Sequence, residues 1–296
     1  MTDNIVFCGE EKNKIVGGML YLVATPIGNL ADLTERAAKI LAEVDFIAAE
    51  DTRVTAKILN HLGISKPLLS YHEHNKRSCG EIILRRLQAG ESCALVTDAG
   101  TPAISDPGED IARLCEENGV PVTAAPGACA MIDALILSGM PTRRFCFEGF
   151  PEGNRNKQRK RLEELKGERR TMIFYEAPHS LIDTLAMMME VFGGERRIAI
   201  CRELTKRNEE IFRTTLRDAN IRYSTQTPRG EYVLIVAGAT EETDLFWSGM
   251  TVAAHVSFYM DAGMTKMEAV KATARDRGVA KNVIYQEMLS LEGKQS

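Results

Sequence analysis

The stretch TDAGTPAISDPG, residues 97–108, decides how the fold of this chain is interpreted. The apolar run SCALV at residues 92–96 precedes it and is typical of a short buried strand. Residues 109–115 follow with helical spacing and acidic side chains in the first turn. Ligands of open α/β sheets bind at the carboxyl ends of strands, where glycine lets the backbone approach closely. The stretch therefore predicts a loop that contacts a small polar ligand through backbone groups.

Two other segments repeat this arrangement of strand and loop. MLYLVA at 19–24 leads into TPIGN at 25–29, and VTAA at 122–125 leads into PGACA at 126–130. Three loops of this kind predict one composite pocket built at the ends of several strands. The alternative is ordinary chain turning, because any α/β domain uses glycine and proline at its corners.

The first half of the chain alternates between strand and helix patterns. The expected strands are 19–25, 45–49, 67–71, 92–97 and 120–125, and the expected helices are 33–44, 54–62, 79–89, 109–118 and 128–138. Such alternation predicts an α/β fold with a mostly parallel, doubly wound sheet that has helices on both faces.

The second half has an α+β pattern and ends in a helical tail. Strands are expected at 144–150, 171–176 and 197–203, with helices at 156–166 and 179–191. Residues 209–215 and 230–238 resemble adjacent antiparallel strands, 239–246 resemble a linker, and 251–291 are helical with one break at 277–279. The expected organisation is a flexible extension 1–18, domains 19–140 and 141–240, and a small helical appendix 245–296. The appendix resembles a helix-turn-helix, and packing, dimerisation and nucleic-acid contact all remain open for it.

Composition indicates a globular protein of the cytoplasm. The 296 residues are 44% hydrophobic and 26% charged, and no apolar run approaches the roughly 20 residues that a membrane span needs. The first eighteen residues lack the features of a secretory signal. The seven cysteines are scattered without a CxxC pair, as in reduced proteins. No metal site is expected, because His72 and His74 have no third ligand nearby in the sequence.

A basic run follows the turn at 150–153, although the net charge of the chain is −4. Its cations are Arg155, Lys157, Arg159, Lys160 and Arg161. Clustered cations of this kind are typical of a surface that binds nucleic-acid phosphates. A solvated helix with ion-pair partners at Glu163 and Glu164 is the alternative.

Several common ligand-binding motifs are absent. No GxGxxG follows a strand, and neither a GxxxxGK[ST] loop nor a GxSxG elbow occurs. Recognition therefore depends on backbone groups and a few side chains, among which Asp98, Thr101 and Ser105 suit an amino-acid-like group.

These segments together resemble the tetrapyrrole methylases that use S-adenosylmethionine, and within them the branch that methylates a cytidine 2′-hydroxyl of ribosomal RNA. The resemblance rests on LVATPIGNL (22–30), EDTR (50–53), YHEHN (71–75), residues 97–108, PGA (126–128), FEGF (147–150), YEAPH (175–179), CRELTK (201–206) and GEY (230–232), with a weaker match at KNVIY (281–285). It implies a two-domain tetrapyrrole-methylase-like fold, usually a homodimer, with the donor in the cleft between domains. It also implies cytidine 1402 of 16S ribosomal RNA in the small subunit as the target.

The resemblance also assigns roles to positions. The residues carried over to the S-adenosylmethionine site are Pro26, Gly28, Asp98, Gly100, Thr101, Ser105, Gly127, Ala128, Tyr175, Glu176 and Gly230. The basic run would hold RNA phosphates while one nucleotide turns into the cleft.

A ribose hydroxyl is a poor nucleophile until its proton is being removed, so a general base is expected. Asp98 is assigned to the donor, which leaves Glu50 or Asp51 as the base. Arg53 would orient one of them or bind a phosphate. The alternative for residues 50–53 is a helix cap with a surface ion pair.

Two other functions remain open: carbon methylation of a tetrapyrrole with the same donor, and a non-catalytic RNA-binding module.

Overall fold

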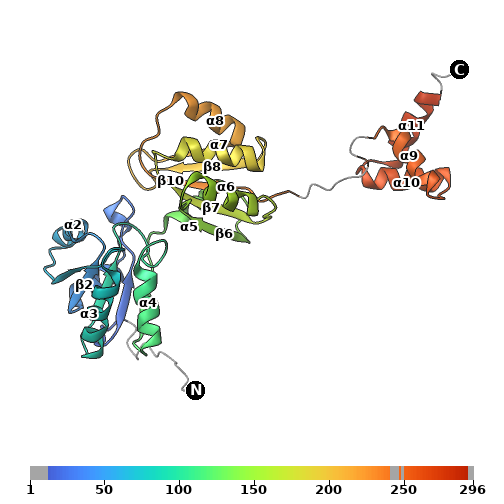
Figure 1. Ribbon diagram of the computed structural model, residues 1–296. Helices are drawn as coiled ribbons and strands as arrows, with labels where there is room; N and C mark the ends of the chain where they lie inside the picture. The colour runs from blue at the N-terminus through green and yellow to red at the C-terminus, as the bar shows by residue number, and fades with distance from the viewer. Residues whose placement is uncertain (1–12, 241–246, 248–249, 293–296) are drawn as a thin grey trace. The chain divides into compact units, whose positions relative to one another are not determined.

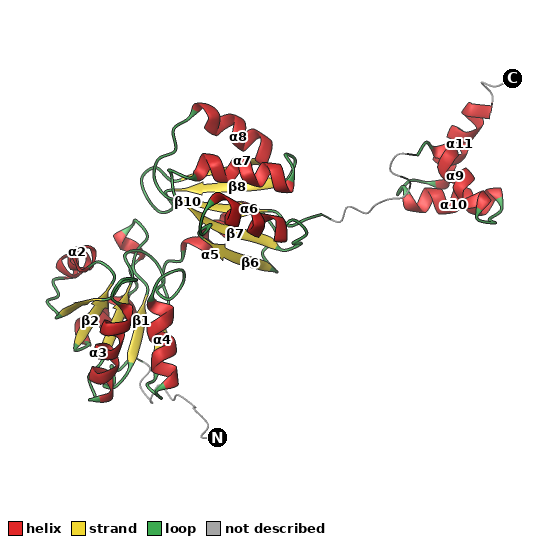
Figure 2. Ribbon diagram, viewed as in Figure 1, coloured by secondary structure: helices red, strands yellow, loops and turns green. Residues whose placement is uncertain are grey.

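The structure, a computed structural model, describes residues 13–240, 247 and 250–292. Two compact units divide the chain, at residues 1–239 and 240–296, and each is treated by itself. The first unit holds two β-sheets with their helices, and the second is helical (Figures 1 and 2). The first twelve residues of the expected extension, and 241–246 of the expected linker, lie outside the described residues.

The first sheet is entirely parallel and has the strand order β3-β2-β4-β1-β5. Its strands are β1 (Leu20–Val23), β2 (Phe46–Ala49), β3 (Leu68–Ser70), β4 (Cys93–Val96) and β5 (Val122–Ala125). All residues of β2 and β4 are buried, as expected for parallel strands covered on both faces. The doubly wound parallel sheet predicted from the sequence is confirmed.

Helices cover both faces of this sheet. Helices α1 (Glu35–Glu43) and α2 (Thr52–Leu62) pack on one face, where Ile40 and Ile58 belong to the same apolar core as Val23. Helices α3 (Lys76–Gln88) and α4 (Gly108–Glu117) pack on the other, where Ile83 and Ile111 meet alternate residues of the same strands. A short 3-10 helix, η1 (Leu30–Asp32), follows β1. Each face therefore has its own apolar core, and the loops at the carboxyl ends of the strands remain outside both.

The second sheet is mixed and has the order β6-β7-β10-β8-β9. Its strands are β6 (Phe145–Gly149), β7 (Thr171–Glu176), β8 (Arg197–Arg202), β9 (Glu210–Thr215) and β10 (Tyr232–Val236). The β6–β7 pair is parallel, and the other pairs are antiparallel. The mixed second domain expected from the sequence is confirmed in this sheet.

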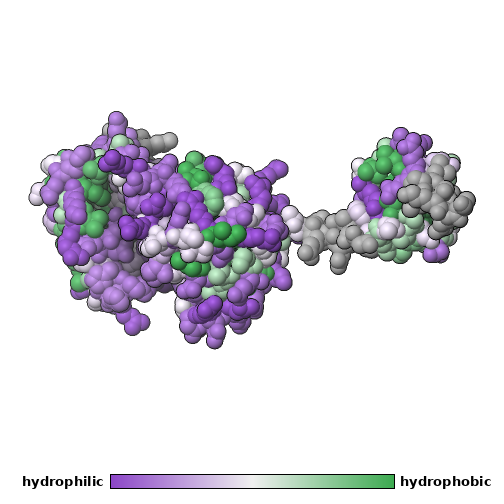
Figure 3. All heavy atoms as spheres, turned by 90° about the horizontal axis from the view of Figure 1, so that it is seen from above, coloured by the Kyte–Doolittle hydropathy of each residue, from purple (hydrophilic) through white to green (hydrophobic). Residues whose placement is uncertain are grey.

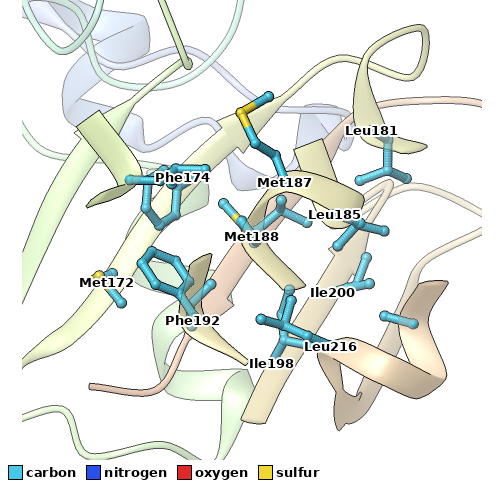
Figure 4. Close-up of a cluster of buried hydrophobic side chains, with 14 of the residues drawn as sticks. Met172, Phe174, Leu181, Leu185, Met187, Met188, Phe192, Ile198, Ile200 and Leu216 are labelled. Atoms are coloured by element: carbon cyan, nitrogen blue, oxygen red, sulfur yellow. The ribbon is translucent and has the colours of Figure 1, made fainter. Parts of the chain in front are cut away.

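The two faces of the second sheet pack against different helices. Helices α6 (Arg155–Glu164), α7 (Leu181–Phe192) and α8 (Leu216–Thr225) supply side chains to one core. In Figure 4, Leu185 and Met188 of α7 lie close to Ile198 and Ile200 of β8. Helix α5 (Ala130–Ser138) covers the other face, and Ile27 from the first half joins that core. The two sheets thus share apolar contacts through the β1 loop.

One expected strand pairing is wrong. The segments 209–215 and 230–238 form β9 and β10, but β8 lies between them and pairs with both. The cause is helix α8 (Leu216–Thr225), which was not among the expected helices. It occupies most of the connection, so the chain crosses the sheet instead of turning in a hairpin.

The tail was expected as two helical segments, and its described residues form three helices, α9 (Val252–Asp261), α10 (Lys266–Asp276) and α11 (Lys281–Glu292). The missed break follows α9, where Gly263 adopts φ +92° and Thr265 with Glu268 forms a capping box. Apolar side chains of the three helices form a separate small core.

The face in Figure 3 is mostly hydrophilic, with scattered apolar residues. Within the described part of the chain, no helix has both the length and the apolar character that crossing a bilayer requires.

Candidate active site

A cavity of about 450 Å³ lies between the carboxyl ends of the strands of the first sheet and the ends of two neighbouring strands of the second, β7 and β10. The first wall consists of residues 97–101 and 104–106, with Ile27, Glu50 and residues 129–130. The second wall consists of Phe150 and residues 175–178 and 231–233. The loop at 97–108 and the PGACA segment therefore meet in one composite pocket, as the sequence suggested.

Gly100 joins two of the predicted loops. Its N–H donates to the Thr25 carbonyl at 3.0 Å, and the Thr25 N–H donates to its carbonyl at 2.9 Å. Gly100 has φ +85°, and an added Cβ would lie 3.2 Å from Ile27 Cγ2. A side chain is therefore disfavoured here both by backbone conformation and by space. Thr101 adds a second link by donating to the Ala128 carbonyl at 3.0 Å.

Asp106 shapes the same loop, and sequence reasoning missed it. Its carboxylate accepts the N–H groups of Ala103, Ile104 and Gly108 at 3.0, 3.3 and 2.7 Å. These bonds hold Ala103 and Ser105 at φ +67° and +61°, a region that non-glycine residues rarely occupy. Burial raises the pKa of the Asp106 carboxyl above its ordinary value. An Asp next to Pro107 in a turn-rich segment was the available signal.

Glu50 and Asp98 lie together on the first wall. Thr97 Oγ1 donates to Glu50 Oε2 at 2.7 Å, and Asp98 Oδ1 accepts the Asp51 N–H at 3.0 Å. Burial, followed by the nearby Glu50 charge, raises the pKa of the Asp98 carboxyl. Two carboxylates from neighbouring strand ends thus lie side by side in the cavity lining.

Asp51 and Arg53 are engaged with each other outside the cavity lining. Asp51 is the N-cap of α2 and accepts the Arg53 N–H at 2.8 Å. The Arg53 guanidinium pairs with the same carboxylate at 2.6 Å and is 87% exposed. Its hydrogen bonds lower the pKa of the Asp51 carboxyl to about 2. The capping role weighed for residues 50–53 is therefore present in the structure.

The second wall is more apolar. Tyr175 contacts the rings of Phe147 and Phe150, with centroids 5.0 and 5.4 Å apart. Glu176, the last residue of β7, is 4% exposed and lies opposite Tyr232 in the sheet register. Both strands therefore present their ends to the cavity.

The other predicted donor-site residues lie outside this lining in the described structure: Pro26, Gly28, Gly127, Ala128 and Gly230. The glycines allow close packing beside it. A Cβ at Gly28 would lie 2.3 Å from Lys206 Cγ, and one at Gly230 would lie 2.6 Å from the Glu203 side chain. Lys206 in turn pairs with Glu203 and Glu231, both at 2.9 Å.

The charges of the cavity all have one sign. Five carboxylates contribute to its lining, and no lysine or arginine does so among the described residues: Glu50, Asp98, Asp106, Glu176 and Glu231. Such a lining favours a ligand with positive charge and repels phosphate groups. A wider groove of about 780 Å³ adjoins the cavity and shares Ile104, Ser105, Asp106 and Phe150 with it.

The predicted RNA-binding cations lie on α6, where they differ in their partners. Arg159 pairs with Glu163 and Glu190, and Arg161 pairs with Glu148 and Glu164. No ion pair within the described residues involves Arg155, Lys157 or Lys160, which are all exposed. Glu148 also lines the adjoining groove, so the basic helix and that groove are neighbours.

The protein has a parallel α/β sheet joined to a mixed sheet, with a polar cavity at the strand ends between them. Such a cavity is where two-domain α/β enzymes bind their ligands. The model of the tetrapyrrole (corrin/porphyrin) methylases matches residues 19–220, and the chain belongs to this family. It is therefore a methyltransferase by family.

Curated relatives extend this comparison over most of the chain. A protein from Synechocystis named ribosomal RNA small subunit methyltransferase I is 45% identical and covers 93% of this chain and 99% of its own length. A protein of the same name from Halalkalibacterium halodurans is 48% identical, and the match covers 90% of this chain and 93% of the relative's length. The chain thus resembles these relatives over nearly their whole length.

Solved structures show the same fold at low identity. The methyltransferase CobJ matches with TM-score 0.58 and 20% identity, covering 75% of this chain and 95% of its own. Uroporphyrin-III-C-methyltransferase from Thermus thermophilus matches with TM-score 0.55 and 18% identity. The match covers 74% of this chain and 94% of that protein. At these identities the likeness concerns the fold alone.

Proposed function

We propose that this protein transfers a methyl group from S-adenosylmethionine to the ribose 2′-hydroxyl of a cytidine in 16S ribosomal RNA, at cytidine 1402. The observation that carries the proposal is the acidic cavity between the two sheets. It occurs in a chain whose relatives are named ribosomal RNA small subunit methyltransferase I. The proposed substrate would place the enzyme in the cytoplasm.

The cavity suits the donor in charge and in chemistry. The donor bears a sulfonium, an ammonium and a carboxylate, so its net charge is positive, and the first wall offers Asp98 and Asp106 to its positive groups. The second wall offers Tyr175 and Pro178 to a flat ring. Gly100, Thr101 and Ser105 would complete the donor site, with Gly28, Gly127 and Gly230 supporting its loops.

The bound donor supplies a methyl group already activated by a positively charged sulfur. The protein then has to align the acceptor hydroxyl and accept its proton. Glu50 is our candidate base, because it lies in the cavity lining with only one oxygen bonded to Thr97. The Asp51 carboxylate, with a pKa of about 2 and Arg53 bound to it, is a weak base and is assigned to capping α2.

The RNA would be held outside the acidic cavity. Arg155, Lys157 and Lys160 are exposed without an ion pair in the described structure and are free for phosphates. The cavity repels phosphates, so the proposal requires only the target nucleoside to enter it. The resemblance also implies a homodimer, which light scattering would report as twice the 32.8 kDa chain.

The proposal is tested by incubating the protein with methyl-labelled S-adenosylmethionine and small ribosomal subunits that lack the modification. We expect label in 16S ribosomal RNA, recovered after nuclease digestion as 2′-O-methylcytidine. Label on uroporphyrinogen carbon instead would favour the tetrapyrrole alternative, which the exposed cations of α6 argue against. RNA binding without donor binding would favour a non-catalytic module.

A further inference from the structure

Glu176 has a buried carboxylate oxygen without a partner. Its side chain is 4% exposed, and Oε2 has no hydrogen-bond partner among the described residues. Buried polar groups are nearly always hydrogen-bonded, and a carboxylate oxygen needs a donor most of all. Because Glu176 belongs to the cavity lining, a bound ligand is the natural source of that donor.

The rest of the side chain is fixed in place. Oε1 accepts the Ala177 N–H at 2.8 Å and the Ser180 hydroxyl at 2.5 Å. The carboxylate therefore has one oxygen committed to the protein and one available to a ligand. A group held in this way recognises a donor at a defined position.

The surroundings of Glu176 indicate which part of a ligand it meets. Tyr175, Pro178 and Val233 line the same wall and offer apolar and aromatic surface. Glu231, the other carboxylate of that wall, is 76% exposed and already paired with Lys206. The remaining carboxylates lie on the opposite wall. An aliphatic ammonium therefore suits the first wall, and a flat ring bearing an amino group suits the second.

We propose that Glu176 accepts a hydrogen bond from the exocyclic amino group of the donor's purine ring, and so selects a 6-aminopurine over a 6-oxopurine. This inference rests on the proposed function, because it assumes that the S-adenosyl donor occupies the cavity. Ser180 acts as a positioning residue that holds the carboxylate. A 6-oxopurine would place its own oxygen against the carboxylate, so the hydrogen bond from the exocyclic group would be lost.

Equilibrium calorimetry with two unreactive ligands tests the assignment. S-adenosylhomocysteine and S-inosylhomocysteine differ at C6, where an oxygen replaces the amino group, and at the adjacent N1, which gains a hydrogen. We expect the wild-type chain to bind the adenosyl compound about tenfold to a hundredfold more tightly, the range for one hydrogen bond to a charged group. In Glu176→Gln the ratio should fall below about threefold, because an amide can also donate to the ring oxygen.

Two further variants keep the result interpretable. Glu231→Gln, on the same wall but exposed and paired with Lys206, should leave the ratio unchanged. Ser180→Ala should narrow the ratio only partly, since the carboxylate itself remains. Thermal melts of each variant report whether it is folded.

The outcomes separate the two claims. If neither compound binds the wild-type chain, the proposed function fails and the inference fails with it. If the adenosyl compound binds but the ratio is near one, or Glu176→Gln leaves a large ratio intact, the proposed function stands and the role of Glu176 is wrong.

Discussion

At the residue scale, carboxylates lie close together in the cavity lining, and this lowers the free energy of unfolding of the chain. Asp98 is next to Glu50, and burial together with that charge raises its pKa above the ordinary value of 3.8. A carboxyl with a raised folded-state pKa binds its proton more tightly in the folded state. Its ionisation therefore lowers the free energy of unfolding as pH rises through the folded-state pKa. The clustered carboxylates of the cavity lining are thus a local source of instability.

Replacing Asp98 with Asn should make this cost visible. At pH 7 we expect Asp98→Asn to raise the free energy of unfolding by less than about 1 kcal/mol, because the group is partly exposed. The melting temperature should rise slightly as a result. The gain should disappear below pH 3.8, where the carboxyl is protonated in both states. Donor affinity should fall in the same variant. Melting curves from pH 3 to 8 and calorimetry measure both, and a variant less stable at pH 7 would refute the assignment.

The two candidate bases can be told apart by matched amides. Glu50→Gln should lower kcat about a hundredfold, the usual contribution of a general base, with donor affinity changed much less. Asp51→Asn should lower kcat less than about tenfold, because its carboxylate is bound to Arg53 and caps α2. Single-turnover methylation of small subunits gives both rates. The opposite ranking would move the base to Asp51.

The candidate site was predictable where it depended on local signals. Asp98, Gly100, Thr101 and Ser105 belong to one turn-rich loop, and they are in the cavity lining. Asp106 was missed because its role comes from three backbone bonds within the folded loop. Lys206 was missed because its contact with Gly28 joins segments far apart in the chain. Periodicity and turn chemistry carry no information on the contact between Lys206 and Gly28.

At the element scale, α6 separates cations that serve the fold from cations available to a ligand. Arg159 and Arg161 each have two carboxylate partners, whereas Arg155, Lys157 and Lys160 have no ion pair in the part of the chain described. Exposed pairs contribute little stability, so the difference concerns availability to phosphates rather than the strength of the fold.

This division predicts unequal effects on RNA binding. Replacing Arg155, Lys157 and Lys160 together with Ala should weaken binding to 16S ribosomal RNA. It should also reduce the slope of log K against log salt by about 0.7 for each lost single-stranded contact. Replacing Arg159 and Arg161 should have a smaller effect on the slope. Filter binding across a salt series measures it, and equal slopes for the wild type and the triple variant would exclude α6 from the RNA surface.

Helices and parallel strands followed from the sequence because their periodic patterns are local. The doubly wound sheet was recovered from alternation of buried runs and amphipathic segments. The pairing of β9 and β10 was wrong, because helix α8 lies in their connection and its weak apolar pattern was not recognised. The break at Gly263 was missed because a single glycine resembles a tolerated helical position.

At the scale of the whole molecule, the described residues that line the cavity all belong to the unit 1–239. The tail has its own core around Val256 and Ile284. A chain ending at Ala239 should therefore keep its affinity for S-adenosylhomocysteine within about twofold of the full chain, since no cavity contact is removed. Calorimetry on both chains measures it. A loss of more than tenfold with the fold intact would make the tail part of the donor site.

In the function proposed for this protein, the acidic cavity presents an activated methyl group to a ribose hydroxyl of ribosomal RNA. The most direct measurement is mass spectrometry of nuclease-digested 16S ribosomal RNA from cells with and without this protein. We expect one 2′-O-methylated cytidine to disappear when the protein is absent and to return with the wild-type chain but not with Glu50→Gln. Identical methylation of the ribosomal RNA in both kinds of cell would contradict it.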